Sequence, residues 1–556
     1  MTLMKNWDVL ADLKKKKFST DEIVDVLLQN RGLKTKKERE EFLSPKKPGE
    51  VSLKDVGLTK DAVKKGVDRV KKALKQKEKV VVYGDYDADG ICATAILWEA
   101  LFGLGINAMP YIPERFSEGY GLNAESISNL KKENPELSLI ITVDNGIVAN
   151  EAVEKANELG INVLITDHHA KGKKLPKAHA VIHTTEIGGA GIAWVFAREV
   201  LSELGKKSSP APSLELAAIG TIADQIPLLY ANRSFVKYGL EDLAKTKRVG
   251  LNALFKEAAI EKEGINTYHV NFLIAPRLNA MGRMQHAIDS LRLLCTTDPK
   301  RASELANLLG ETNKERQRVV EEVVLHAKSA ANKDGEELSV IVVSDESYHE
   351  GVVGLAASKL VEEFYRPAIV FSKGKDVSKA SARSISGFNI IEAIRKVEEM
   401  LLGAGGHPMA AGLSLETSKI GEFTEKINKV ARPLLTEDVL TRTRKGDMEI
   451  EPDIVGDEFV EALKKFEPAG IGNPRPTFLT IGLDVVSART VGKTGDHLKL
   501  RLAKPPVVFE AIAFNKGFLL KDIEEKGKVD VVYNVEENIW NGRRSIELRV
   551  KDLATN

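Results

Sequence analysis

Three short apolar runs that each lead, within two residues, into aspartate constrain this 556-residue chain more than any other feature. They are KVVVY (79–83), SLIITV (138–143) and INVLIT (161–166), which have the length and β-branched content of buried strands. Helical patterns follow the first two runs. Strands that alternate with helices predict a parallel sheet covered on both faces. The carboxyl ends of these strands then meet at one edge, where α/β proteins bind their ligands.

The side chains at these strand ends are mostly carboxylates and imidazoles. In strand order they are Asp85, Asp87 and Asp89, then Asp144, and then Asp167, His168 and His169. Like charges at close range cannot all ionise without a cation, and carboxylates with imidazoles suit Mn²⁺ or Mg²⁺. A single aspartate there would only cap the next helix. Asp224, which ends the apolar run LELAAIGTIAD, can be such a cap or a further ligand.

A pair of metal ions held by carboxylates favours phosphoryl chemistry. One ion lowers the pKa of a bound water, and both stabilise the attacking and leaving oxygens of an in-line displacement. The sequence has no GxxxxGK[ST] phosphate loop and no GxSxG nucleophile turn. The residues therefore indicate hydrolysis by metal-activated water.

The rest of the chain changes character twice. A helical stretch with one long apolar-striped segment is followed by a second α/β pattern, and the last part has five or six strand-like runs without a long helix. An all-β tail of that kind is typical of an OB-type barrel. We expect an N-terminal helical segment at 1–60, an α/β catalytic domain with a parallel sheet at 61–230, a helical region with a long connecting helix at 231–335, a smaller α/β domain at 336–440 and an OB-like barrel at 441–556.

Composition narrows the class further. Lys and Arg number 81 and Asp and Glu 80, so the net charge of +1 gives no overall attraction to nucleic acid. Two cysteines exclude a disulfide scaffold and a Cys-rich zinc module. The sequence shows neither a signal-peptide core nor an apolar run long enough for a membrane span, and we expect a cytoplasmic protein without membrane contact.

The motifs together resemble the DHH phosphoesterase superfamily and, within it, the RecJ-type single-strand exonucleases. The four signature blocks are DYDADG (85–90), VDNG (143–146), DHH (167–169) and GTIAD (220–224). Further matching blocks are YIPERFSEGYGLN, APRLNAMGRM, HEGVVGLAASKL, SARSISGFNI, GAGGHPMAAGLSL and EPAGIGNPRPTF. The match runs from about residue 25 to the C-terminus. It implies that the two α/β domains are a DHH domain and a DHHA1-like domain.

The resemblance implies roles for individual residues. Two Mn²⁺ or Mg²⁺ ions are expected on Asp85, Asp87, Asp89, Asp144, His168 and Asp224. Catalytic roles are implied for Asp87, Asp89, Asp144, His168, His169 and Asp224. Substrate contacts are implied for Arg115, Tyr120, Arg277, Asn279, Ser381, Arg383, Gly405, Gly406 and His407. Arg277 and Asn279 can instead clamp helices together, and Tyr120 can instead belong to the core.

The implied activity is metal-dependent hydrolysis of single-stranded DNA from 5′ to 3′, releasing 5′-mononucleotides during repair, recombination or replication. RNA stays open as a substrate, and replication or repair proteins are expected partners. A phosphodiesterase for oligonucleotides or cyclic dinucleotides and a replication scaffold with residual nuclease activity are the alternatives. In the barrel, the candidates for guiding the strand are Lys493, Lys499, Arg501, Trp540, Arg543 and Arg544.

Overall fold

The computed structural model describes residues 7–11, 17–206, 211–331, 339–540 and 543–555. The chain forms two compact units, each of which combines segments that are distant in sequence. The larger unit consists of Leu58–Ala223 and Leu243–Arg442, and the smaller unit of Met1–Gly57, Asp224–Asp242 and Thr443–Asn556.

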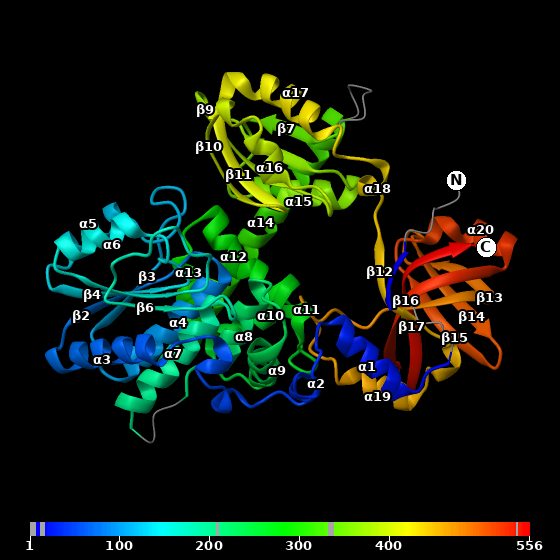
Figure 1. Ribbon diagram of the computed structural model, residues 1–556, viewed down its shortest axis with the longest axis horizontal. Helices are drawn as coiled ribbons and strands as arrows, with labels where there is room; N and C mark the ends of the chain where they lie inside the picture. The colour runs from blue at the N-terminus through cyan, green and yellow to red at the C-terminus, as the bar shows by residue number, and fades with distance from the viewer. Residues whose placement is uncertain (1–6, 12–16, 207–210, 332–338, 541–542, 556) are drawn as a thin grey trace. The chain divides into compact units, whose positions relative to one another are not determined.

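A five-stranded parallel sheet of order β3-β2-β4-β5-β6 begins the larger unit (Figure 1). Its strands are β2 (Lys79–Tyr83), β3 (Ala108–Tyr111), β4 (Leu137–Val143), β5 (Asn162–Asp167) and β6 (Ala180–His183). Helices α5 (Ala124–Glu133) and α6 (Asn150–Glu158) cover one face, and α3 (Lys60–Gln76), α4 (Ala88–Gly103) and α7 (Gly189–Leu204) cover the other. Because both faces are covered, the central strands are apolar throughout rather than alternating.

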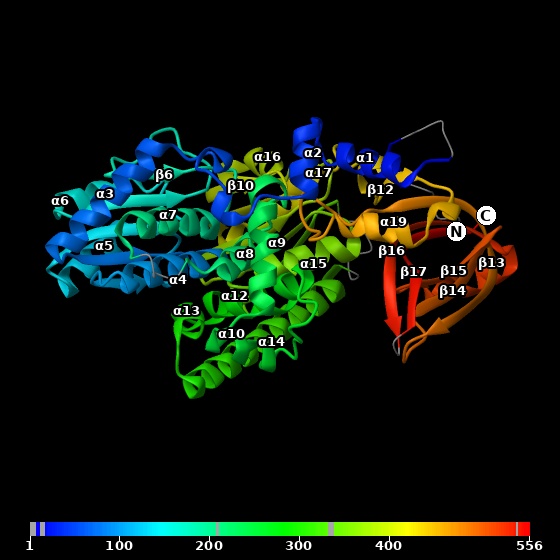
Figure 2. The same cartoon turned by 90° about the horizontal axis from the view of Figure 1, so that it is seen from below.

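The helical region of the larger unit is arranged along one long helix. α14 (Pro299–Ala331) packs against α10 (Val249–Glu257), α12 (Ala275–Met284) and α13 (Ile288–Cys295), and Figure 2 shows these helices gathered together. Its far end packs against α15 (Val353–Phe364), so one helix connects the first sheet to the next.

The second sheet of the larger unit is mixed, with the order β10-β11-β9-β8-β7. Its strands are β7 (Ile341–Asp345), β8 (Ala368–Ser372), β9 (Val377–Arg383), β10 (Leu401–His407) and β11 (Ala410–Glu416). Helices α15, α16 (Ile390–Arg395) and α17 (Ile420–Ala431) accompany it. β7 and β8 are parallel, and the other pairs are antiparallel.

A closed five-stranded barrel forms most of the smaller unit. Its strands are β13 (Phe478–Val491), β14 (His497–Lys504), β15 (Val507–Ala513), β16 (Lys528–Trp540) and β17 (Arg543–Thr555). Pairing of β13 with β16 closes the barrel, and β12 (Arg444–Glu449) and β1 (Trp7–Ala11) extend the sheet beside β13. α1 (Thr20–Asn30), α2 (Lys36–Leu43) and α19 (Asp457–Lys464) share its core through Ile23, Leu27, Phe42 and Phe459.

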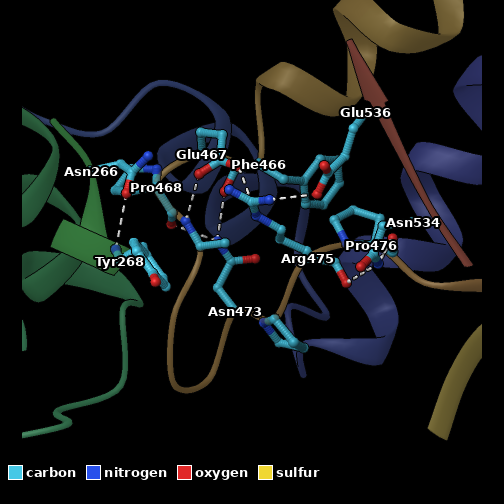
Figure 3. Close-up of polar contacts among 12 residues, drawn as sticks. Asn266, Tyr268, Phe466, Glu467, Pro468, Asn473, Arg475, Pro476, Asn534 and Glu536 are labelled. Carbon is cyan, nitrogen blue, oxygen red and sulfur yellow. Dashed lines mark hydrogen bonds and ion pairs between the residues drawn. The ribbon is translucent and has the colours of Figure 1, made fainter. Parts of the chain in front are cut away.

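A fully buried arginine fixes the loop that leads into the barrel. Arg233 is 0% exposed and donates hydrogen bonds to the carbonyl oxygens of Phe42 and of residues 465–468 at 2.7–3.3 Å. Asn473 adds hydrogen bonds to Phe466 O at 2.6 Å and to Pro468 O at 3.0 Å (Figure 3). A buried cation is tolerated only when its donors are satisfied in this way.

The predicted fold class is confirmed: a parallel-sheet domain, a long connecting helix, a smaller α/β domain and a C-terminal barrel follow one another along the chain. Across the described residues, every helix is too short or too polar to cross a lipid bilayer.

Candidate active site

Three neighbouring strands bring the predicted acidic side chains to one edge of the parallel sheet. Strands β2, β4 and β5 are adjacent, and Asp85, Asp144 and Asp167 lie at or just beyond their carboxyl ends. Each of these residues is only 1% exposed. A buried carboxylate is costly unless it is hydrogen-bonded or neutralised, so this edge is suited to a cation.

The side-chain ligand atoms gather in three overlapping groups, and within each group they lie within 4.8 Å of one another. The groups are Asp85, Asp87 and Asp144; Asp89, His168 and Asp224; and Asp144, His168 and His169. Asp224 takes its place as the residue directly after α8 (Leu214–Ala223). All six predicted metal ligands therefore occur in these groups, and their assignment to particular ions stays a prediction.

Backbone donors at the starts of two helices hold the first acidic turn. Asp87 is the N-cap of α4, and its Oδ1 accepts hydrogen bonds from the N–H groups of Asp89 and Gly90, each at 3.0 Å. The carboxylate of Asp89 accepts from Gly189 N at 2.7 Å and from Ala190 N at 2.9 Å, at the start of α7. The partial positive charge of a helix N-terminus stabilises both acids where they stand.

Two glycines allow α7 and α8 to approach the acids closely. A Cβ on Gly189 would lie 2.3 Å from Asp144 Oδ1, and one on Gly220 would lie 2.2 Å from Asp89 Oδ1. Asp144 itself has a left-handed φ of 64°, a costly conformation that recurs at active sites. Sequence reasoning missed these glycines as site residues, although the run GGAG (188–191) and the GTIAD block contain them, because only packing shows what they face.

The electrostatics of the cluster favour a bound cation. Burial and the charge of Asp87 raise the pKa of Asp85 well above its usual range. Burial, together with the charge of His169, lowers the pKa of His168 to about 4. His168 is therefore a neutral imidazole at pH 7, the form that binds metals. Hard oxygen ligands with an imidazole fit Mn²⁺ or Mg²⁺.

A second set of hydrogen bonds orients His169. Its Nδ1 lies 2.7 Å from Asp167 Oδ1, and its Nε2 lies 3.1 Å from the hydroxyl of Tyr120. Asp167 also accepts from Ile147 N at 2.8 Å. Burial raises the pKa of Asp167, but the hydrogen bonds from His169 and the backbone outweigh burial and keep that pKa below its usual range. Asp167 therefore acts as a fixed anion that holds the ring of His169.

A cavity of about 480 Å³ in the larger unit gathers basic side chains. The polar side chains that line it are those of Arg115, Arg283, Glu350, Lys379, Ser381, Arg383 and Ser414. Arg383 donates to Ser381 Oγ at 2.8 Å, and backbone from Gly403 to Gly405 forms part of the wall. Burial and the nearby charges of Arg115 and Arg316 lower the pKa of Arg283 to about 10. Crowded cations beside open backbone favour an anion such as phosphate.

Arg115, which lines the cavity, contacts the acidic turn at Tyr86. The guanidinium of Arg115 lies 5.0 Å from the centre of the Tyr86 ring, and Tyr86 separates Asp85 from Asp87 in the chain. Arg283 was missed by sequence reasoning, although it stands one helical turn after Asn279 in the APRLNAMGRM block.

The remaining predicted substrate residues have other surroundings. Asn279 Oδ1 accepts a hydrogen bond from Ala88 N at 2.7 Å, so this side chain holds the acidic turn. Arg277 is paired with Glu257, Nε to Oε2 at 2.5 Å, and ties two helices together. Gly405 lines the cavity.

The strand β10 continues from Gly405 into Gly406 and His407, and this end of the strand is exposed. Gly406 has a left-handed φ of 150°. A Cβ there would lie 2.4 Å from Ala410 O, so only glycine fits at this bend.

The predicted strand-guiding residues of the barrel are mostly engaged with acids. Lys499 is paired with Glu547, and Arg501 lies 4.0 Å from Glu510. Arg544 is paired with Glu537. Lys493 is exposed, and the side chains of Trp540 and Arg543 lie outside the described part of the structure.

This fold and site define a class, the DHH phosphoesterases that carry a DHHA1 domain and an OB domain. Family models match in that order: the DHH family N-terminal domain over 79–221, the DHHA1 domain over 337–432 and the RecJ OB domain over 446–552.

Individual relatives narrow the class. The chain is 36% identical over 543 residues to the single-stranded-DNA-specific exonuclease RecJ of Bacillus subtilis, covering 96% of this chain and 68% of that protein. It is 35% identical to the RecJ of Thermus thermophilus, with 87% and 70% covered. The crystal structure of Thermus thermophilus RecJ in complex with Mn²⁺ matches with a TM-score of 0.81 at 30% identity, over 96% of this chain and 76% of that chain. The chain therefore belongs to the RecJ family, and the resemblance inferred from its motifs is confirmed.

Proposed function

We propose that the protein is a metal-dependent exonuclease that hydrolyses single-stranded DNA from the 5′ end and releases 5′-mononucleotides. The observation that carries this proposal is the pairing of a carboxylate–imidazole cluster with a basic cavity that borders it through Arg115 and Tyr86. A metal cluster supports phosphodiester hydrolysis, and an adjoining anion site supports recognition of a chain end. The RecJ relatives, named as specific for single-stranded DNA, favour this substrate over the oligonucleotide and scaffold alternatives.

We propose that hydrolysis takes place at the acidic edge of the parallel sheet. Two Mn²⁺ or Mg²⁺ ions are assigned to Asp85, Asp87, Asp89, Asp144, His168 and Asp224. Bound there, such ions supply Lewis-acid stabilisation and a low-pKa water. The chain's own contribution is to fix the ligands before binding, through the α4 and α7 N-termini and the close glycine contacts.

His169 is the proposed contact to the scissile phosphate. Asp167 holds the ring at Nδ1, and Nε2 exchanges the hydroxyl of Tyr120 for a phosphate oxygen when a strand binds. A preoriented donor costs no reorganisation when charge develops on the phosphate oxygens.

The basic cavity is the proposed site for the terminal phosphate. Arg383 and Ser381 come from β9, Arg283 from α12 and Arg115 from the loop after β3, so the cavity collects donors from several elements. An anion site for a terminal phosphate beside the metal site would place the first phosphodiester bond at the metals, which supports an exonuclease rather than an endonuclease.

Domain limits and cellular context are also proposed. We propose that the DHH domain spans 61–230 and the DHHA1-like domain 336–440. Single strands must be supplied by strand-separating or end-processing reactions, so we place the enzyme with replication or repair proteins. Because its proposed substrate is cellular DNA, we propose the cytoplasm as its compartment.

The test is digestion of 5′-labelled and 3′-labelled single-stranded DNA and RNA with Mn²⁺. The proposal predicts that 5′-labelled DNA gives labelled mononucleotide at once, while 3′-labelled DNA shortens gradually. Cleavage inside the strand, release from the 3′ end, or activity confined to dinucleotides or cyclic dinucleotides would contradict it.

A further inference from the structure

One exposed pair of aromatic rings lies in the helical region of the larger unit. Tyr268 and Phe272 are 57% and 62% exposed, and their ring centroids lie 4.9 Å apart with the planes inclined by 34°. The side chain of Asn266 accepts a hydrogen bond from Tyr268 N at 3.0 Å (Figure 3), and with His269 it completes a capping box. The rings therefore stand on a firmly capped helix start.

A local widening of the helix follows the first ring. Val270–Ile274 form a π-helical turn, in which Ala275 N donates to Val270 O five residues back. Pro276 explains the widening, because proline lacks an N–H and its ring clashes with the carbonyl four residues earlier in a regular helix. Single π turns of this kind occur frequently at functional sites.

Arg277 supports this turn. Its Nη1 donates to Leu273 O at 2.9 Å, and its Nε donates to Glu257 Oε2 at 2.5 Å. Glu257 is itself held against α14, because a Cβ on Gly310 would lie 2.1 Å from its Oε1. Arg277 is thus a positioning residue for the ring pair, which gives a physical reason for an arginine that does not reach the cavity.

One continuous helical segment leads from the rings to the active site. Phe272 lies in the π turn directly before α12, and Asn279 and Arg283 share one side of α12, because four residues are close to one helical turn. Asn279 bonds the acidic turn and Arg283 lines the cavity. The opposite side is fully buried at Ile274, Leu278 and Met281. Phe272 precedes Asn279 by about 10 Å of helix rise, roughly three stacked-base spacings.

We infer that Tyr268 and Phe272 form a stacking platform for bases of the single strand whose end lies in the active site. The inference rests on the proposed exonuclease function. Every base has a π-face, so stacking holds a strand without reading its sequence, as an enzyme that removes each nucleotide in turn requires. Because the platform lies at a fixed distance from the proposed metal site, the bases of one stretch of the strand should contribute more to binding than the others.

An abasic scan combined with substitution tests this position dependence. Binding of the full-length protein to a 5′-phosphorylated strand of about 20 nucleotides, long enough for several contacts, is followed by anisotropy in excess EDTA so that no strand is cut. Single abasic sites should weaken binding most about three nucleotides from the 5′ end, by roughly fivefold or more. In Phe272→Leu, which keeps apolar bulk without an aromatic face, the intact strand should bind roughly tenfold more weakly. The penalty for that abasic site should then disappear.

A matched control is available in Phe102, which is 63% exposed and stacks on Trp98 at 5.3 Å at the far end of α4. Phe102→Leu should leave both the affinity for the intact strand and the penalty for the abasic site unchanged. Phe272→Trp should keep the abasic penalty. An identical abasic profile in Phe272→Leu and the unmodified protein would overturn the platform. So would an equal loss in Phe102→Leu.

If the unmodified protein degrades single strands without any position-dependent penalty, the platform fails and the proposed function stands. Failure of the unmodified protein to degrade them refutes the function itself.

Discussion

The acidic edge of the parallel sheet and the outer surface of the barrel are both rich in charge, but they arrange it in opposite ways. At the edge, buried carboxylates from three strand ends face one another. On the barrel, acids and bases alternate in pairs such as Lys516 with Asp552 at 2.7 Å and Arg475 with Glu536 at 2.7 Å (Figure 3). At the edge the carboxylates are held by backbone N–H groups and imidazoles, whereas on the barrel the acids are paired with Lys and Arg.

The difference separates charge that binds from charge that is already satisfied. Buried carboxylates that lie close together raise the free energy of the protein until a cation binds, which makes metal binding favourable. Exposed ion pairs contribute about 0–1 kcal/mol each and leave little net field for a phosphate. The comparison therefore predicts large effects at the edge, intermediate effects in the basic cavity and small effects on the barrel.

The largest effect is expected for Asp144→Ala. Asp144 belongs to two of the three ligand groups, so its loss should disturb both ions. Hydrolysis of labelled single strands should fall roughly 10²- to 10⁴-fold, because Lewis-acid stabilisation is worth several kcal/mol. Strand affinity in EDTA should persist. Asp61→Asn, an exposed acid on α3, is the control; near-normal turnover of Asp144→Ala would make the edge structural.

Replacement of Arg383 by alanine should give the next largest effect. The guanidinium lines the cavity and is not a metal ligand, so Mn²⁺ binding should be retained. Affinity for 5′-phosphorylated strands should fall roughly ten- to hundredfold, as for loss of a charged hydrogen bond, with a smaller loss for 5′-hydroxyl strands. Arg395 is an exposed arginine on α16, and Arg395→Ala should change the affinity for neither kind of strand. Equal losses on both kinds of strand would remove the terminal phosphate from this cavity.

A smaller change is expected from Tyr120→Phe. This variant removes only the hydroxyl that holds His169 Nε2 at 3.1 Å. Turnover should decrease roughly three- to tenfold, in line with one neutral hydrogen bond, while KM changes little. Steady-state kinetics on a short single strand measures both. A rise in KM at constant turnover would instead assign Tyr120 to substrate binding.

The smallest effects are expected on the barrel. Lys499→Ala and Arg544→Ala each remove a base that is paired with a glutamate. Strand affinity should change less than about twofold, and the slope of log affinity against log salt should stay within about one of its original value. Lys493→Ala, at an exposed lysine, is the comparison. A slope reduced by about one in either paired variant would mean that these bases leave their glutamates for phosphates.

The sequence predicts the acidic edge well because its signal is local. Each acid follows an apolar strand directly, and the topology of a parallel sheet then brings Asp85, Asp144 and His168 together without further information. Arg277 could not be assigned in this way. Its partners Glu257 and Leu273 become neighbours only through the fold, so the motif alone does not show the contacts that this arginine makes.

The barrel shows the same limit on a larger scale. Lys499 and Glu547 are 48 positions apart and meet through the arrangement of β14 and β17. Helical periodicity predicts the helices near the N-terminus, but it does not say that Ile23 and Leu27 pack into the barrel core. A chain that ends near residue 440 would expose these side chains, so point substitutions on the barrel test its role more cleanly than truncation.

Counting bound Mn²⁺ in protein stripped of metal tests the central claim most directly. Calorimetric titration with Mn²⁺, carried out on the unmodified protein and on Asp144→Ala, measures whether the buried carboxylates form a metal site. Two ions per chain are expected in the unmodified protein, with fewer or more weakly bound ions in the variant and hydrolysis of single strands that returns as the ions bind. Full hydrolysis in excess EDTA, or equal Mn²⁺ binding by both proteins, would contradict a metal site at this edge.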